Sequence, residues 1–411
     1  MKNVVYIIIY ALIYQFIHIN FLYGNFSYIG YMNEGFSTFS FVVTMMLICM
    51  PLVLKNKISD AFFLEILYAI FYILLYVPIL ITFLNHYKTE WNIFINQLPF
   101  TIGFLLMFGI AGMRKIELGR LNLKPPKKEI LVVIAVLMVI VLFLEFRSTY
   151  SFVSFEDVYS QREKGSNSSL IGGYFTLWLT YFIGPVLVSI GLVKKNKIIL
   201  ILGTLSIIFI YGINASKIAL FIPFLIIFLY YIKKTGKDTF RALVIVFSSV
   251  CIIAYSLPEE YFMISAVILM RTFGISGLLT YQYNVFFEEN PLTYYSHINI
   301  VNFVTNAYPY QQDLGFVVSS YFIDGDNNAN ANFLATDGIA SLGLIGVIVI
   351  SVITGLYMLY TKSQISNNDS LAIGLIFISF AFIILNVGLF TSLLSGGFLF
   401  LNVYLYLYKS S

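Results

Sequence analysis

Apolar runs of about 20 residues, the length that crosses a bilayer as an α-helix, recur from one end of this 411-residue chain to the other. Inside a bilayer every backbone N–H and C=O must be satisfied within its own segment, so such runs fold as helices. Charged residues make up 11% of the chain and hydrophobic residues 59%, whereas soluble domains carry roughly 25% charged residues. This composition excludes an ordinary soluble enzyme and predicts an all-α, polytopic integral membrane protein with a single transmembrane domain over residues 1–411.

The hydropathy pattern predicts about twelve spans. The N-terminal run reads as an uncleaved first helix, because no small-residue cleavage site follows it. The two cysteines, Cys49 and Cys251, fall inside predicted spans, which does not support a disulfide. The expected spans are 3–22, 36–54, 61–84, 96–113, 129–146, 174–193, 198–213, 216–232, 240–257, 333–361, 371–387 and 390–408.

The positions of the basic residues predict an orientation. With the N-terminus taken as cytoplasmic, the cytoplasmic segments collect 18 of the 24 lysine and arginine residues. Cytoplasmic loops of membrane proteins carry such an excess, so both termini are expected on the cytoplasmic side. Two external loops then follow, one at 147–173 and a larger one at 257–332. The larger loop is the longest polar interruption of the chain, and we expect most of any chemistry there.

Several stretches carry a resemblance to a known family. One is the run Asn-Ala-Asn-Ala-Asn-Phe-Leu-Ala-Thr-Asp-Gly-Ile-Ala-Ser-Leu-Gly-Leu-Ile-Gly from Asn328 to Gly346. Another is Arg271-Thr-Phe-Gly-Ile-Ser-Gly, which is followed by Pro291-Leu-Thr-Tyr-Tyr-Ser. A third is the many-span layout with two larger external loops. In these features the chain resembles the Wzy-type O-antigen or capsular polysaccharide repeat-unit polymerases.

The family can also carry an external arginine followed, after ten intervening residues, by glycine. Arg162 and Gly173 match that spacing in the first external loop. In the second loop Arg271 departs from it, because Gln282 stands at the equivalent position. The arginine-glycine pattern therefore supports the resemblance in one loop only.

The resemblance implies a plan like that of GT-C glycosyltransferases, in the cytoplasmic (inner) membrane. It implies a glycan polymerase that joins oligosaccharide repeat units linked to polyprenyl pyrophosphate, on the outer face of the membrane and without a cofactor or metal ion. The expected partners are the lipid-linked oligosaccharide and the bilayer, with a chain-length regulator and a flippase as further candidates and no nucleic acid. The alternatives are a lipid-linked oligosaccharide flippase or other transporter, and an O-antigen ligase of similar plan.

Three cations are candidates for binding a pyrophosphate. Arg271 follows an apolar run near the expected membrane surface, and its planar fork of donors suits phosphate oxygens. Arg162 lies in the first external loop, and Lys217 opens a predicted helix behind Asn214, Ala215 and Ser216. The alternative for each is an ordinary interfacial or solvated side chain that snorkels to the membrane surface.

Asp337 is the first candidate for a general base, because a carboxylate one turn inside a predicted span is costly unless it faces water or a partner. Its alternative is a helix-end carboxylate near the positive N-terminus of the helix. His297 is the second candidate. Glu288 and Glu289 rank below both, since adjacent residues on a helix point in different directions.

Asn328, Asn330 and Asn332 alternate with alanine, and their amides can both donate to and accept from sugar hydroxyls. A turn followed by an N-cap is the alternative, and we expect at least one of the three to do only that. Asp324 and Asp326 invite a metal hypothesis. The spacing fails the calcium-loop pattern, with Ala329 where glycine is required and Ala335 where the closing acid belongs, so we interpret them as a polar turn.

Overall fold

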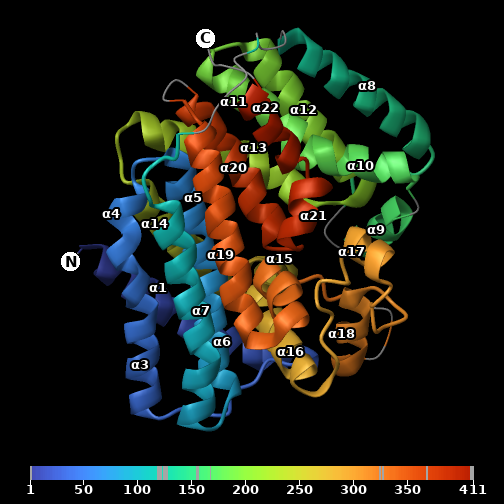
Figure 1. Ribbon diagram of the computed structural model, residues 1–411. Helices are drawn as coiled ribbons and strands as arrows, with labels where there is room; N and C mark the ends of the chain where they lie inside the picture. Colours follow the sequence, from blue (N-terminus) through green and yellow to red (C-terminus); the bar gives the residue numbers. More distant parts are fainter. Residues whose placement is uncertain are drawn as a thin grey trace.

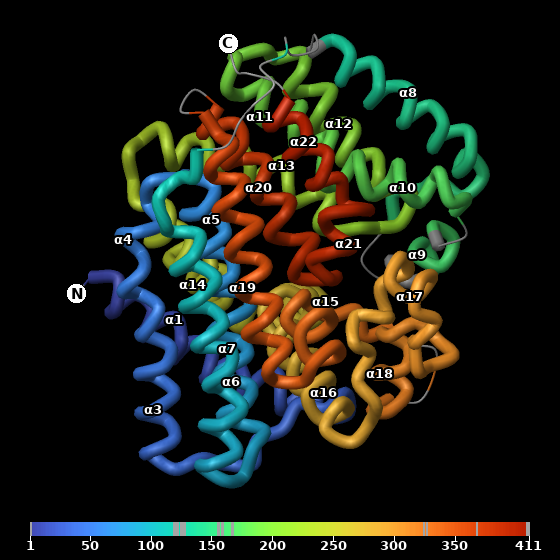
Figure 2. The backbone as a smooth tube through the Cα atoms, in the orientation of Figure 1, coloured from blue at the N-terminus to red at the C-terminus, as the bar shows by residue number. Residues whose placement is uncertain are grey.

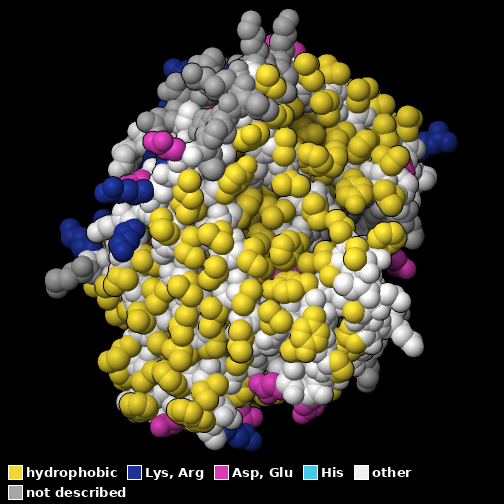
Figure 3. Space-filling view, in the orientation of Figure 1, with side chains coloured by type: hydrophobic (Ala, Val, Ile, Leu, Met, Phe, Trp, Pro, Cys, Tyr) yellow, Lys and Arg dark blue, Asp and Glu magenta, His cyan; other side chains and the backbone are white. Residues whose placement is uncertain are grey.

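A computed structural model describes residues 2–117, 123, 128–153, 157–166, 168–323, 325, 328–366 and 369–407, without the side chains of 128, 158, 159 and 166. The regular structure of these residues is helical throughout (Figures 1 and 2). Hydrophobic side chains cover most of the face in Figure 3, and most of the lysine and arginine visible there gathers toward the upper left. This confirms the prediction of an all-α polytopic membrane protein.

Nine helices of the described residues are long and apolar enough to cross a membrane. Helices α14, α20 and α22 are apolar but shorter, and α13 (Lys217–Lys234) carries lysines at both ends. The nine are Lys2–Ile29, Thr38–Ile58, Phe62–His86, Glu90–Ala111, Glu129–Phe146, Leu170–Val193, Lys197–Asn214, Glu259–Glu289 and Leu334–Gln364, and the three shorter ones are Thr239–Tyr255, Ser370–Ile384 and Phe398–Leu407.

The central helix is continuous through α5 (Phe62–Phe71), η4 (Tyr72–Tyr76) and α6 (Val77–His86), and nearly all of it is buried. A helix that is apolar all round must be covered on every face. Its tyrosine hydroxyls find partners in the neighbouring helix: Tyr68 donates to the carbonyl of Pro51 at 2.9 Å and Tyr76 to that of Leu47 at 2.7 Å. Burial of these rings therefore leaves no hydroxyl unsatisfied.

Small residues allow α7 (Glu90–Ala111) and α19 (Ala340–Gln364) to pack closely. A Cβ added at Gly355 would lie 2.6 Å from the carbonyl oxygen of Met107, and one at Gly103 would lie 2.6 Å from Oγ of Ser351. Membrane helices associate through such close backbone approach, since lipid supplies no hydrophobic force between them. This contact fixes α19, which leads into the candidate site.

The predicted external loop over 257–332 is wrong in its first half. Residues Glu259–Glu289 form one helical run through α15 (Phe262–Ile268), η7 (Leu269–Gly274) and α16 (Ile275–Glu289). The acidic pairs stand at the two ends of this run, and Arg271 is the one charged residue between them. The acidic residues at both ends lower the average hydropathy of this apolar helix. The polar interruption of the chain is therefore shorter than expected, and Arg271 lies on a π-helical turn.

The chain folds back on itself where the Asn328–Gly346 run ends. Leu342 (φ −141°, ψ 21°) and Gly343 (φ 63°, ψ −152°) break the helix, and the second conformation is open only to glycine. A Cβ on Gly338 would lie 3.2 Å from Val347, which is nine residues ahead, and therefore η8 (Leu334–Ile339) packs against the first turns of α19. This hairpin carries Asp337 into the protein interior.

Candidate functional site

Asp337 and His297, which are 40 residues apart in sequence, are in direct contact. Nε2 of His297 lies 3.1 Å from Oδ1 of Asp337. The His297 side chain is 11% exposed and that of Asp337 is 2% exposed. The structure thus joins the two residues that the sequence offered as alternative bases, with His297 as the member that reaches solvent.

The second oxygen of Asp337 is held by the backbone that opens α21 (Leu389–Leu394). Oδ2 accepts from the N–H of Leu389 at 2.5 Å and from that of Phe390 at 3.4 Å. Gly388 makes room for this approach, since a Cβ there would lie 2.5 Å from Oδ1. Both oxygens of the carboxylate are therefore engaged by hydrogen-bond partners. Asp337 therefore orients and stabilises its neighbour, and the geometry favours His297 as the group that exchanges a proton.

Thr293 determines which nitrogen of His297 carries hydrogen. Its hydroxyl donates to the carbonyl of Ala340 at 2.9 Å, because a carbonyl can only accept. The hydroxyl has a single hydrogen, so it must accept from Nδ1–H of His297, which lies 3.0 Å away. A contact between Nε2 and Oδ1 then requires one more hydrogen between them. The pair holds that proton in the arrangement observed, as an imidazolium beside a carboxylate or as a neutral acid beside an imidazole.

The turn that presents His297 is under local strain. Tyr294 and Tyr295 are consecutive residues with φ of 47° and 65°, a region that costs non-glycine residues about 1 kcal/mol or more each. Two backbone hydrogen bonds hold this turn against the hairpin, from Thr293 N–H to Ala340 O at 2.8 Å and from Tyr294 N–H to Ser341 O at 3.2 Å. Strain of this kind persists where the surroundings over-determine a geometry, which is the requirement of a positioned side chain.

Two buried hydroxyls flank the pair and have no hydrogen-bond partner among the described residues: Tyr295 Oη and Ser341 Oγ. Burial, reinforced by the charge of Asp337, raises the pKa of Tyr295. Thr293 and Ser341 were not predicted as neighbours of the pair. The spacing of four residues between Thr293 and His297 is compatible with a side-chain contact. It indicates such a contact only if the segment between them is known to form a compact turn.

Two of the predicted pyrophosphate ligands, Arg162 and Arg271, lie near enough to the third, Lys217, for their charges to act on it. Partial burial, and then the charges of Arg162 and Arg271, lower the pKa of Lys217 to about 8. Lys217 begins α13, and Arg162 lies on α9 (Val158–Ser166). The charges of Arg162 and Arg271 thus act on Lys217, and the three cations form a positive centre, which is the environment a multiply charged anion requires.

Helix α9 is held beside the start of α13 by Gln161. This side chain is fully buried, and its amide donates to the carbonyls of Gly212 at 2.9 Å and Ile213 at 3.0 Å, in the last turn of α12 (Lys197–Asn214). A Cβ at Gly165 would lie 2.8 Å from the oxygen of Ile213. Arg162 follows Gln161 directly, so the docking of this short helix fixes its position.

Asn332 links the cationic centre to the His297–Asp337 pair. Its amide donates to Thr280 Oγ1 at 2.8 Å and to the carbonyl of Ser276 at 3.4 Å, both on α16. Along the helical run Glu259–Glu289, Arg271 lies five residues before Ser276 and nine before Thr280, about 8 and 14 Å of helix, and Asp337 lies five residues after Asn332. The two groups therefore belong to neighbouring parts of one scaffold.

The structure favours the N-cap alternative for Asn332 over a sugar contact. The residue is 1% exposed, and its Oδ1 accepts from the N–H groups of Leu334 at 3.0 Å and Ala335 at 3.3 Å. It is the N-cap of the hairpin helix, with all of its polar atoms occupied. Asn328 and Asn330 are exposed beside Gly315, near the start of α18 (Leu314–Phe322), where sugar binding stays a prediction.

The other acidic candidates do not join the site. Glu288 accepts from the Asn284 amide at 2.8 Å, and Glu289 accepts from the Tyr321 hydroxyl at 2.8 Å. Asp324 and Asp326 lie outside the described residues. Among those described, no three His, Cys, Asp or Glu side chains converge as they would around a metal ion, and Cys49 and Cys251 are both free thiols.

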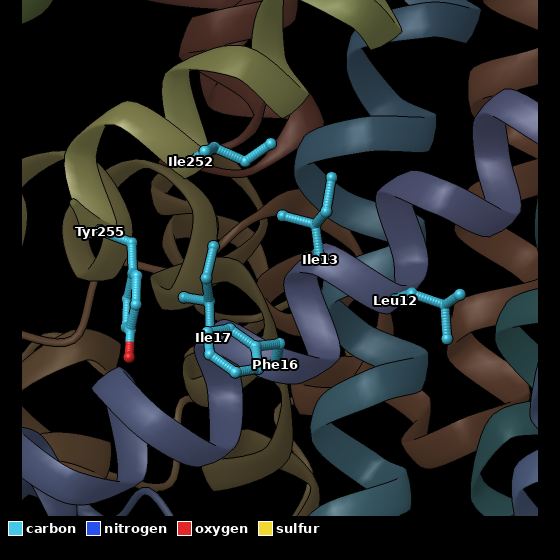
Figure 4. A pocket seen from close by; sticks show the side chains of 6 residues that line it. All are labelled: Leu12, Ile13, Phe16, Ile17, Ile252 and Tyr255. Carbon is cyan, nitrogen blue, oxygen red and sulfur yellow. The ribbon is translucent and has the colours of Figure 1, made fainter.

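A separate apolar groove of about 320 Å³ lies between the first and ninth predicted spans. It is lined by Leu12, Ile13, Phe16 and Ile17 of the first helix and by Ile252 and Tyr255 of α14 (Thr239–Tyr255), with the Tyr255 ring beside Ile17 and Phe16 (Figure 4). The Tyr255 hydroxyl is its one polar side-chain group. The groove suits hydrocarbon and carries no chemistry of its own.

Comparisons of the chain with models of protein families, with curated proteins and with solved structures find no match.

Proposed function

We propose that this protein is a membrane glycosyltransferase that joins polyprenyl-pyrophosphate-linked oligosaccharide repeat units into O-antigen or capsular polysaccharide. The observation that carries the proposal is a proton-holding histidine–aspartate pair built on the same helical scaffold as three mutually repelling cations. Transfer of a glycosyl group from a lipid pyrophosphate needs both: positive charge for the departing pyrophosphate and a base for the acceptor hydroxyl. The resemblance of the Asn328–Gly346 run to such polymerases supports it.

In the proposed reaction, Arg162, Lys217 and Arg271 bind the pyrophosphate of the growing chain. The bond between the anomeric carbon and the pyrophosphate oxygen breaks, and its electron pair passes to the pyrophosphate, whose charge the cations stabilise. A hydroxyl at the non-reducing end of a new lipid-linked unit forms a bond to that carbon. Its proton passes to Nε2 of His297.

The arrangement of the pair places a condition on this step. Nε2 faces Asp337 and already shares a proton with it, so that proton must leave and the imidazole must turn toward the acceptor before it can act as a base. Asp337 is then a positioning residue, which steers the imidazole and stabilises it once it is charged.

The proposal is tested in cells that carry single substitutions in this protein. Arg271→Ala and His297→Gln should abolish long surface polysaccharide while the protein still accumulates in the membrane. Lys88→Ala is the matched control, since Lys88 is a cation of the same predicted external side, and its side chain is 76% exposed and pairs with Glu34 at 3.2 Å. Long chains in the first two variants would sink the proposal.

A flippase for the same lipid-linked unit is the second candidate. The broken helix at Leu342 and Gly343, with a carboxylate beside it, is of the kind that transporters use at their binding sites. A vesicle assay with labelled lipid-linked units distinguishes the two functions. Movement of label between leaflets without chain growth would support the flippase.

A further inference from the structure

A polar pocket of about 370 Å³ lies far from the candidate site, where the turn between α4 (Lys55–Ile58) and α5 meets the turn between α13 and α14. Three lysines and two carboxylates line it: Lys55, Lys233, Lys237, Glu65 and Asp238. The pocket belongs to the end of the spans that the sequence places at the cytoplasm. Its charges have no part in the proposed reaction.

Both carboxylates of the pocket are already neutralised. Lys55 pairs with Asp238, and Lys233 Nζ lies 3.1 Å from Oε2 of Glu65. Arg241 adds a second cation to Asp238, with Nη2 3.8 Å from Oδ2. Four cations thus face two carboxylates when Lys237 is included.

Lys237 supplies positive charge that the protein does not offset. It is exposed and lines the pocket, and no carboxylate of the described residues forms an ion pair with it. The walls are mixed, with Ser59 offering a hydroxyl and Ile58 and Phe240 offering apolar surface. A ligand that fits must carry negative charge, hydroxyl donors for the carboxylates, and some apolar surface.

Apolar surface for a lipid continues beside the pocket. Val53 is 71% exposed two residues before Lys55, and Tyr231 is 59% exposed two residues before Lys233. Val53 lies near the end of a helix that is long and apolar enough to cross a membrane, and Tyr231 lies in the last turn of the apolar helix α13. Basic pockets between transmembrane helices are a known setting for anionic headgroups.

We propose that this pocket binds the headgroup of an anionic phospholipid, with its phosphate beside Lys237 and Lys233 and its headgroup hydroxyls toward Glu65 and Asp238. A bound lipid would tie the α4–α5 turn to the α13–α14 turn. Phosphate chemistry is shared with soluble anions, and the adjacent exposed apolar side chains favour the lipid. The inference does not depend on the proposed function.

The test is the retention of lipid by the purified full chain, measured by native mass spectrometry in vesicles of phosphatidylglycerol and phosphatidylcholine. Phosphatidylglycerol should be retained in preference. Lys237→Gln should weaken this binding about fivefold, and Lys237→Arg should restore it. Lys194→Gln is the matched control, because Lys194 is an exposed lysine in the α11–α12 turn (Gly184–Val193 and Lys197–Asn214) that does not line this pocket.

Three outcomes would overturn the proposal. Equal retention of the two lipids would show that the pocket does not select charge. An equal loss in Lys194→Gln would mean that binding follows general surface charge. Displacement of the lipid by millimolar inorganic phosphate or glycerol 3-phosphate would identify a soluble anion as the ligand.

Discussion

Replacement of Thr293 tests whether one hydroxyl fixes the hydrogen of His297. Thr293 is 1% exposed, donates to Ala340 and accepts from His297. Thr293→Val keeps the shape but leaves Nδ1–H of His297 without a partner, and an unsatisfied buried donor costs about 1–3 kcal/mol. The carbonyl of Ala340 loses one of its two hydrogen bonds but is not left unsatisfied, because it still accepts from the backbone N–H of residue 293.

Thr293→Ser is the matched comparison, because it keeps the hydroxyl and removes one methyl group worth about 0.8 kcal/mol. Valine should therefore lower the free energy of unfolding by about 1 kcal/mol more than serine. If the hydrogen bond is also needed when His297 accepts a proton, valine should reduce the rate of chain growth by roughly tenfold to a hundredfold, at 1.36 kcal/mol per decade. Denaturant unfolding in detergent measures the first effect, and the rate of chain growth measures the second.

The nitrogen-15 shifts of His297 give a direct readout, since the protonated and bare ring nitrogens resonate at different positions. Nδ1 should carry hydrogen in the wild type and in Thr293→Ser. In Thr293→Val, rings with hydrogen on Nδ1 and rings without it should both be populated. A valine variant as stable and as active as the serine variant, with an unchanged spectrum, would refute this reasoning.

Three further predictions follow from the same structure. Lys217 binds an anion only when it is protonated, and its pKa is about 8. Chain growth should therefore fall above pH 8. Lys217→Arg should remove that fall in a pH–rate profile, because arginine stays protonated. Burial alone would raise the pKa of Asp238, but hydrogen bonding and the charge of Lys55 outweigh burial and lower this pKa. The ionised Asp238 therefore stabilises the fold at neutral pH, and this stabilisation is lost as the pH falls from the pKa of a free aspartate through the lowered pKa of Asp238. Asp238→Asn should accordingly cost about 1 kcal/mol at pH 7 and little at acid pH in thermal unfolding, and an equal cost at both would count against the pair. Asn332→Ala should lower the free energy of unfolding by about 2 kcal/mol through loss of the N-cap and its bonds to α16, whereas a stable variant that had lost only sugar affinity would restore the original hypothesis.

The spans were predictable where apolar runs were uninterrupted. The central helix Phe62–His86 is an example, because its continuous apolar run predicts a membrane-spanning helix. Its burial does not follow from composition, since Glu129–Phe146 has the higher mean hydropathy and is only 22% buried. The helix over Glu259–Glu289 was not predicted, since hydropathy is read in sequence windows and the acidic ends diluted the apolar middle. A charge at a helix end costs little, because it reaches water beyond the membrane.

The candidate site was predictable as residues but not as an arrangement. Asp337 and His297 were offered as competing bases, each from its own chemistry, and no spacing in the sequence indicates a contact across 40 residues. The pairing depends on the reversal at Gly343 and on the strained turn before His297. Both are backbone conformations that tertiary packing imposes.

The cations illustrate the opposite case. Arg162, Lys217 and Arg271 were each selected for phosphate chemistry without regard to the others, and the effect of Arg162 on Lys217 arises from the docking of α9 through Gln161. Gln161 had no functional signature in the sequence. A buried amide that satisfies helix-end carbonyls is visible only once those ends are placed.

The central claim is that this chain transfers a glycosyl group between lipid-linked units. The most direct measurement supplies the purified protein, in vesicles, with one defined oligosaccharide on polyprenyl pyrophosphate and analyses the products by mass spectrometry. We predict chains that grow by whole repeat units, with one polyprenyl pyrophosphate released for each bond formed and neither product in Arg271→Ala. Recovery of the substrate unchanged, or its movement across the membrane without chain growth, would contradict the claim.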